Sequence, residues 1–181
     1  MAHTTLYDVR GALPDAQDTE LFDFVIPTLP GGTGALGRNL AILCQQAIYP
    51  GRSNEIMEVP IHGTQLNFAG RAIQPRTMSV AYAESSNLFI TRIFQQWFEE
   101  QRSIITGTSN GYKANYAVDG ATLFKYDTAG VVADVITFYG LQPEDMPDQQ
   151  LDGSSTNLWV VNMTFRYDFY LSRNVKNYRQ R

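Results

Sequence analysis

The clearest pattern in this sequence is a regular alternation of apolar positions with mixed or polar positions from Thr156 to Leu171. Side chains alternate between two faces only in an extended chain, so this period of two predicts a β-strand and not a helix. Such a strand is longer than the roughly five or six residues usual in globular sheets. We therefore predict that it forms the wall of a large sheet or barrel. Its apolar face would comprise Trp159, Val161, Met163, Phe165, Tyr167, Phe169 and Leu171.

The segment from Asn87 to Ile104 has a different period. Apolar residues recur here at spacings of three and four, which places them along one face of an amphipathic helix. Ser85, Ser86 or Asn87 can supply the oxygen that caps the start of this helix. We expect one face of the helix to cover an apolar face of a sheet and the opposite face of the helix to be exposed to solvent. The packing positions are Ile90, Ile93, Phe94 and Trp97.

Several further segments alternate or are bounded by turn residues, and we predict them to be strands. They are residues 21–26, 55–62, 64–68, 76–82, 121–126 and 131–141, whereas residues 39–48 could form a strand or a short helix. Strands, one helix and then more strands predict an antiparallel sheet with a packed helix rather than alternating β and α units. The predicted fold class is therefore mainly β, an antiparallel β-barrel or sandwich with one packed α-helix.

Length and composition favour a single domain over residues 1–181, with an N-terminal arm at 1–20 and a basic tail at 172–181. Apolar residues make up 44% of the chain and charged residues only 18%. This low charge fits either a well-packed β domain or a subunit that buries much of its surface against copies of itself. No stretch approaches the roughly 18–20 apolar residues of a membrane span, so we expect no membrane as a partner.

The charged residues are unevenly distributed along the chain. The net charge is −4, but the charged residues of the tail after Tyr170 are all basic, namely Arg173, Lys176, Arg179 and Arg181. The rest of the chain then holds 10 basic and 18 acidic residues, a net charge of −8. Because phosphate binding needs concentrated Lys and Arg, this acidic body is not expected to bind nucleic acid tightly.

The sequence offers little catalytic chemistry. The single cysteine, Cys44, cannot form a disulfide within the chain, and His3 and His62 are too few for a metal cluster. Residues from Gly32 to Gly37 match G-x-G-x-x-G, but a Rossmann site requires a βαβ unit, and strands follow instead. We interpret this motif as a connector and expect no enzyme, no cofactor and no metal site.

Taken in order, these elements resemble the tail tube protein family of contractile-tailed bacteriophages, which is related to the tube proteins of type VI secretion machines. The resemblance covers nearly the whole chain and rests on pattern rather than identity. Its more specific parts are the helix tryptophan, Trp97, and the Gly-Leu-x-Pro element at Gly140-Leu141-Gln142-Pro143. The other parts are the strand Leu21–Ile26, the apolar excursion around Val59–Gly63 and the long aromatic strand near the C-terminus.

The resemblance implies homo-hexameric rings that stack into a hollow tube in a virion tail, assembled in the host cytoplasm. Each subunit would add strands to a shared inner barrel, and double-stranded DNA would pass through it without specific binding. Sheath, baseplate and tail-terminator proteins would be further partners. We expect subunit contacts at Tyr49, Pro50, Ile56, Met57, Val59, Ile61, Arg173, Lys176, Arg179 and Arg181. We expect the lumen wall to be acidic, with Asp134 and Asp168 as candidates.

Two alternatives stay open on the sequence alone. A baseplate tube initiator or a type VI secretion tube protein would have the same fold as a tail tube subunit. A monomeric β-barrel that binds a small ligand would belong to a different functional class. The formation of rings or filaments separates these classes, because a ligand-binding barrel would remain monomeric.

Overall fold

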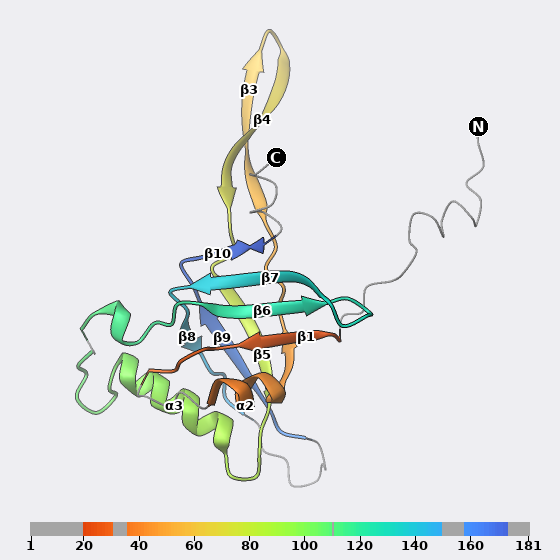
Figure 1. Ribbon diagram of the computed structural model, residues 1–181. Helices are drawn as coiled ribbons and strands as arrows, with labels where there is room; N and C mark the ends of the chain where they lie inside the picture. The colour runs from red at the N-terminus through yellow and green to blue at the C-terminus, as the bar shows by residue number, and fades with distance from the viewer. Residues whose placement is uncertain (1–19, 31–35, 110, 150–157, 174–181) are drawn as a thin grey trace.

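The computed structural model describes residues 20–30, 36–109, 111–149 and 158–173 (Figure 1). Its body is a β-sandwich of two four-stranded antiparallel sheets, which confirms the predicted mainly β class. Sheet I contains, in spatial order, β1 (Phe22–Val25), β6 (Ala121–Tyr126), β7 (Val132–Tyr139) and β10 (Phe169–Ser172). Sheet II contains β2 (Cys44–Ala47), β5 (Thr77–Ala83), β9 (Val160–Arg166) and β8 (Gln142–Asp145).

The remaining elements lie at the edges of this sandwich. Within the described part of the chain, strands β3 (Ser53–Ile61) and β4 (Thr64–Ile73) pair only with each other and form a long hairpin that projects from the body (Figure 1). The helices are α2 (Leu36–Leu43), α3 (Phe89–Gln101) and the 3₁₀ turn η1 (Lys113–Asn115). The structure thus adds a helix, α2, in the segment that the sequence pattern left undecided.

The prediction of one long strand up to Leu171 was wrong. The backbone N–H of Tyr167 donates to Arg76 beside sheet II, whereas the next N–H, that of Asp168, donates to Tyr139 in sheet I. The chain therefore crosses from one sheet to the other at this point. Buried positions change from odd to even numbers across the bend, so Phe169 and Leu171 are exposed, at 45% and 38%.

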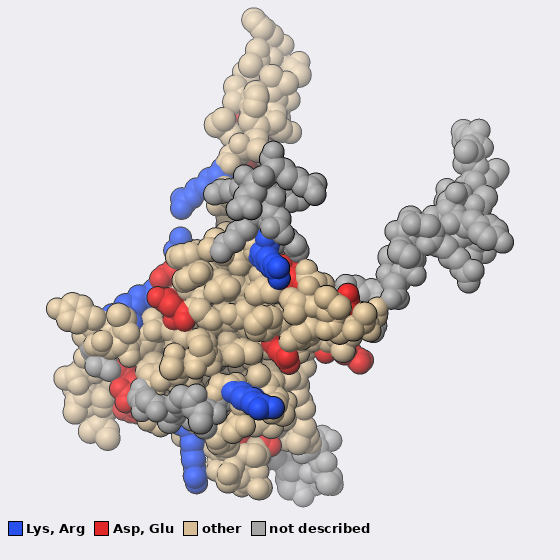
Figure 2. All heavy atoms as spheres, viewed as in Figure 1, with Lys and Arg blue, Asp and Glu red and all other residues tan. Residues whose placement is uncertain are grey.

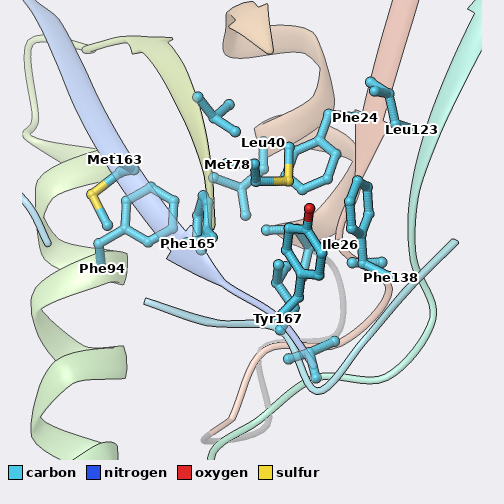
Figure 3. Close-up of a cluster of buried hydrophobic side chains, with 14 of the residues drawn as sticks. Phe24, Ile26, Leu40, Met78, Phe94, Leu123, Phe138, Met163, Phe165 and Tyr167 are labelled. Atoms are coloured by element: carbon cyan, nitrogen blue, oxygen red, sulfur yellow. The ribbon is translucent and has the colours of Figure 1, made fainter. Parts of the chain in front are cut away.

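The core lies between the two sheets and is rich in aromatic rings. The ring of Phe24, on β1, lies 6.2 Å from the ring of Phe138 in sheet I and also 6.2 Å from the ring of Phe165 in sheet II. Figure 3 shows these rings meeting in the centre of the sandwich, with Phe94 of α3 on the other side of Phe165. The two sheets and α3 therefore share one core.

Helix α3 packs on the inner side of sheet II. Ile90, Phe94 and Trp97 are buried and Ile93 is half-buried, so the three- and four-residue spacing defines the face that contacts the body. The indole N–H of Trp97 donates to the carbonyl of Tyr116 at 2.6 Å, so this buried polar group is satisfied.

The start of α3 is capped by Glu84 and not by Ser85, Ser86 or Asn87. Its carboxylate accepts backbone N–H groups from Ser85, Ile90 and Thr91 at 2.8–3.0 Å, and the Thr91 hydroxyl at 2.6 Å. Burial alone would raise the pKa of Glu84. The hydrogen bonds outweigh burial, and the pKa is lowered from its usual value of 4.5.

Replacing Glu84 with glutamine should lower the free energy of unfolding by about 1 kcal/mol at neutral pH, the usual cost of a lost helix cap. Because the pKa of Glu84 is lowered on folding, its stabilising effect is complete above its unfolded pKa. That effect is lost as the pH falls through the lower folded value. The melting temperature of the native protein should therefore fall more steeply below about pH 4.5 than that of Glu84→Gln. Thermal melts followed by circular dichroism measure this, with exposed Glu99→Gln as the control. Parallel pH profiles for the native protein and Glu84→Gln would contradict the cap.

Gly37 lets α2 approach the end of β1 closely. A Cβ added to Gly37 would lie 2.3 Å from the carbonyl oxygen of Ile26, so only glycine fits here. The strands on either side of α2 lie in different sheets, where β1 pairs with β6 and β2 with β5, both antiparallel. The described part of this region is therefore not a βαβ unit, which excludes a Rossmann site at this Gly-rich motif.

Candidate assembly surfaces

The most prominent surface feature is the hairpin of β3 and β4. Its strands are joined by a two-residue turn, in which His62 and Gly63 have φ angles of 47° and 81°. Glycine adopts such angles without strain, which suits the tight turns of hairpins. Along β3 and β4 every residue except half-buried Val59 is exposed. A hairpin alone in water is marginally stable, so this one is suited to contact with another molecule.

One face of the hairpin is apolar. Met57 lies opposite Phe68 and Val59 lies opposite Leu66, with Ile61 at the end of the same row. Met57 is 55% exposed and Phe68 is 47% exposed, large fractions for such side chains. In Figure 2 the hairpin is almost entirely free of blue or red atoms along its length. We call these five residues the hairpin apolar face.

The opposite face of the hairpin is mixed and carries its polar side chains. Glu58 lies opposite Asn67, and Pro60 lies opposite Gln65. The Gln65 amide donates to the Glu58 carboxylate, which ties the two strands together on this side. Ile56 shares this face and is 64% exposed. The hairpin therefore offers one apolar surface for burial and one surface that can remain in water.

A hydrogen-bond cluster fixes the base of the hairpin to sheet I. The Tyr49 hydroxyl donates to the carboxylate of Asp134, which also accepts from the Ser172 hydroxyl at 3.1 Å. The Tyr170 hydroxyl donates to the carbonyl of Gly51 at 3.0 Å. Partial burial of its hydroxyl, together with the Asp134 carboxylate, raises the pKa of Tyr49 to about 12, so this hydroxyl remains a donor at neutral pH. These bonds hold the hairpin at a defined position on the body.

The residues predicted as subunit contacts fall into three groups. Tyr49, Ile56, Met57, Ile61 and Arg173 are exposed, and Val59 is half-buried. Pro50 is buried within its own chain, so we no longer consider it a contact residue. Lys176, Arg179 and Arg181 lie outside the described residues.

The two acids predicted to line a lumen are not free surface charges. Asp134 is only 6% exposed and belongs to the cluster at the hairpin base, so we withdraw it as a lumen candidate. Asp168 is exposed but forms an ion pair with Lys113 at 2.5 Å. A Cβ on Gly140 would lie 2.3 Å from the Asp168 carboxylate, so Gly140 in the Gly-Leu-x-Pro element makes room for this pair.

Sequence reasoning missed two of the five residues of the hairpin apolar face. Leu66 and Phe68 on β4 complete the hairpin apolar face, and Ile73 near its base is 48% exposed. Alternation of Leu66 and Phe68 with polar neighbours was the available signal. The predicted strand ended at Phe68, whereas β4 extends to Ile73, and no contact was assigned to this strand.

A cleft of about 630 Å³ lies beside the base of the hairpin. Its lining includes Phe22, Gln46, Tyr49, Lys125 and Asp134. Its volume falls in the range of ligand pockets. However, the Tyr49 hydroxyl and the Asp134 carboxylate bond to each other rather than pointing unpaired into the cleft. Among the described residues no group of three or more His, Cys, Asp or Glu side chains could hold a metal ion. The helices within this part of the chain are too short or too polar to span a membrane.

Neither a known family model nor a curated protein matches this sequence. Solved structures do match. A chain of the sheath–tube complex of the extracellular contractile injection system PVC, in its extended state, superposes with a TM-score of 0.60 at 13% identity. The match covers 94% of this chain and 99% of that chain.

Two further matches come from other parts of such particles. A chain of the sixfold-symmetrised baseplate of the anti-feeding prophage has a TM-score of 0.61 at 12% identity, covering 87% of this chain and 95% of that one. A chain of the PVC sheath/tube terminator has a TM-score of 0.61 at 11% identity, covering 89% and 99%. This chain therefore has the fold of chains from contractile injection systems, and the predicted resemblance is confirmed at the level of the fold.

Proposed function

We propose that this protein is a structural subunit of a phage-type tail tube, in which copies of the chain form rings that stack into a hollow conduit. The observation that carries the proposal is the projecting hairpin with its exposed apolar face. An exposed apolar surface on a projecting element marks a site of protein contact. The fold shared with a chain of a sheath–tube complex supports the view that the hairpin contacts a neighbouring copy of this chain.

The open edges of the sandwich support self-assembly as well. Among the described residues, β1 and β10 end sheet I and β2 and β8 end sheet II, and no further described strand pairs with these edges. Exposed edges invite pairing with other chains, and closure into a barrel shared by several subunits removes them. Pairing in a ring would cover these edges, while the hairpin would reach a neighbouring subunit or the next ring.

Sixfold rings are the finer form of this proposal, and the sixfold baseplate of a fold relative supports it. Double-stranded DNA would pass through the conduit without specific binding, because a body with a net charge of −8 makes few lasting phosphate contacts. Sheath, baseplate and tail-terminator proteins would be the other partners. The basic residues from Arg173 onward would then meet acidic neighbours at a subunit boundary.

Two kinds of alternative role can be compared with a tube subunit, namely other assembly proteins of the same fold and a monomeric ligand-binding barrel. A tube initiator, a terminator or a type VI secretion tube protein would share the fold, and all would assemble through the same surfaces. A monomeric ligand-binding barrel would have to use the cleft beside Tyr49, which lacks an unpaired polar group at its Tyr49–Asp134 wall. We therefore favour assembly over ligand binding.

The purified full-length protein should form rings or tubes at high concentration. Analytical ultracentrifugation across a concentration series would show species of high mass. Negative-stain electron microscopy would show annular end views and striated side views. A protein that stays monomeric at all concentrations and also fails to elongate on preformed baseplates would contradict the proposed function.

A further inference from the structure

The outward faces of the two sheets differ in chemistry. On sheet II, Ser79 of β5 lies opposite Thr164 of β9, and the next outward pair joins Ala81 with Asn162. Thr77 and Gln46 continue this surface on either side. Apart from half-buried Thr164 and the small, buried Ala81, these residues are exposed. The centre of this face is therefore a surface of hydroxyl and amide groups without charge.

The outward face of sheet I carries more aromatic and aliphatic side chains than that of sheet II, although Thr122 lies opposite Thr137 at its centre and exposed Asp23 lies opposite Phe124. The rings of Tyr139 and Phe169 stack at 4.8 Å, and those of Phe124 and Tyr126 stack at 6.5 Å. Val135 lies opposite Phe124 on the same face. Aromatic surfaces of this kind are typical of contacts between proteins, since burying them releases water from apolar groups.

Among the described residues of sheet II, the outward face carries charge at one end, where Arg166 lies opposite Thr77. Arg166 at the end of β9 forms an ion pair with Glu144 of β8 at 2.7 Å. Asp145 lies on the same strand. The arginine is thus neutralised by its own chain, and the surface from Gln46 to Thr164 stays uncharged.

We propose that the outward face of sheet II lines the bore of the tube, so that a passing anionic polymer meets uncharged hydroxyl and amide groups. This inference rests on the proposed tube function. Lysine or arginine on the wall would bind phosphates and slow passage, in a salt-dependent manner. An apolar wall would exclude the water that hydrates the polymer. The face of sheet II avoids both effects, whereas the face of sheet I is suited to burial against protein.

This assignment replaces an acidic lumen by a neutral one. The expected acids do not contribute free charge, because Asp134 is buried and Asp168 is paired with Lys113. Hydroxyl and amide groups bond readily to water, so the wall would hold a hydrated layer between itself and the cargo. Charge repulsion is then not needed for low friction.

Cysteine labelling of assembled tubes tests the assignment. In a Cys44→Ala background, Ser79→Cys marks the face of sheet II and Leu171→Cys marks the face of sheet I. Each variant is treated with a small maleimide and with a maleimide linked to a globular protein too wide for the bore. In tubes, Ser79→Cys should react with the small reagent, while its reaction with the wide reagent falls to the background of the cysteine-free protein. Dispersed subunits of Ser79→Cys should react with both reagents.

Asn162→Cys provides a second position on the same face in case Ser79→Cys does not fold. Tubes in which Ser79→Cys or Asn162→Cys reacts with the wide reagent, or with neither reagent, would overturn the assignment while leaving the tube function intact. The same holds if Leu171→Cys shows the lumen pattern. If the native protein forms no tubes under any condition, the proposed function fails and this inference fails with it.

Discussion

Replacing Trp97 with alanine should lower the free energy of unfolding by about 3–5 kcal/mol, the range for large-to-small changes in protein cores. Trp97 is only 1% exposed, and its ring lies 5.9 Å from Phe165 and 6.4 Å from Phe94. The change would leave a cavity where α3 meets sheet II. It would also remove the donor to the partly buried carbonyl of Tyr116.

Urea unfolding followed by circular dichroism measures this loss. Gln96→Ala is the matched control, because Gln96 lies next to Trp97 on α3 but is exposed. We expect its stability to stay within about 0.5 kcal/mol of the native value. An unchanged unfolding midpoint for Trp97→Ala would mean that α3 does not stabilise the sandwich.

The parts of this fold that were predictable are those set by local periodicity. The spacing of Ile90, Phe94 and Trp97 predicted helix α3. Alternation of apolar and polar residues predicted strands β1, β3, β5, β6 and β7. Both patterns arise because a residue's face depends only on its place in a regular helix or strand. The order of these elements was then enough to favour an antiparallel sandwich.

The crossing at Tyr167 and Asp168 shows where such reasoning fails. Apolar residues continue at odd positions through the bend, so the sequence pattern carries no sign of it. Strand β9 ends because of tertiary hydrogen bonds. The successive N–H groups of these two residues bond to different sheets. A strand can leave one sheet for the other without any change in its own pattern.

The candidate surfaces were only partly predictable for a similar reason. The apolar character of β3 was visible, and it led to the prediction that Met57 and Ile61 contact neighbouring subunits; both side chains are exposed in this chain. The burial of Asp134 was not visible, since it depends on Tyr49 and Ser172, which are distant in sequence. Charge alone suggested an exposed position for this residue.

The double substitution Met57→Glu/Phe68→Glu should abolish tube elongation and leave soluble subunits or single rings. These two residues lie opposite each other at the end of the hairpin apolar face that is farther from the turn. Burying each side chain contributes roughly 1.5–3 kcal/mol to a contact, and a buried carboxylate would add a desolvation cost. Since every subunit in the tube repeats the contact, the loss should stop assembly. Negative-stain microscopy and sedimentation velocity measure the length and mass of the assemblies.

The control is Asn67→Lys, which adds a charge to the other face of the same hairpin, opposite Glu58 and next to Phe68 in sequence. We expect this variant to form tubes of normal length. The subunits of both variants should melt within a few degrees of the native subunit, because surface substitutions usually change stability by less than about 0.5 kcal/mol. A preserved melting temperature separates a failure of assembly from a failure to fold. Tubes of native length from the double variant would show that the hairpin apolar face makes no contact between subunits, and the central observation behind the proposed function would then have to be replaced.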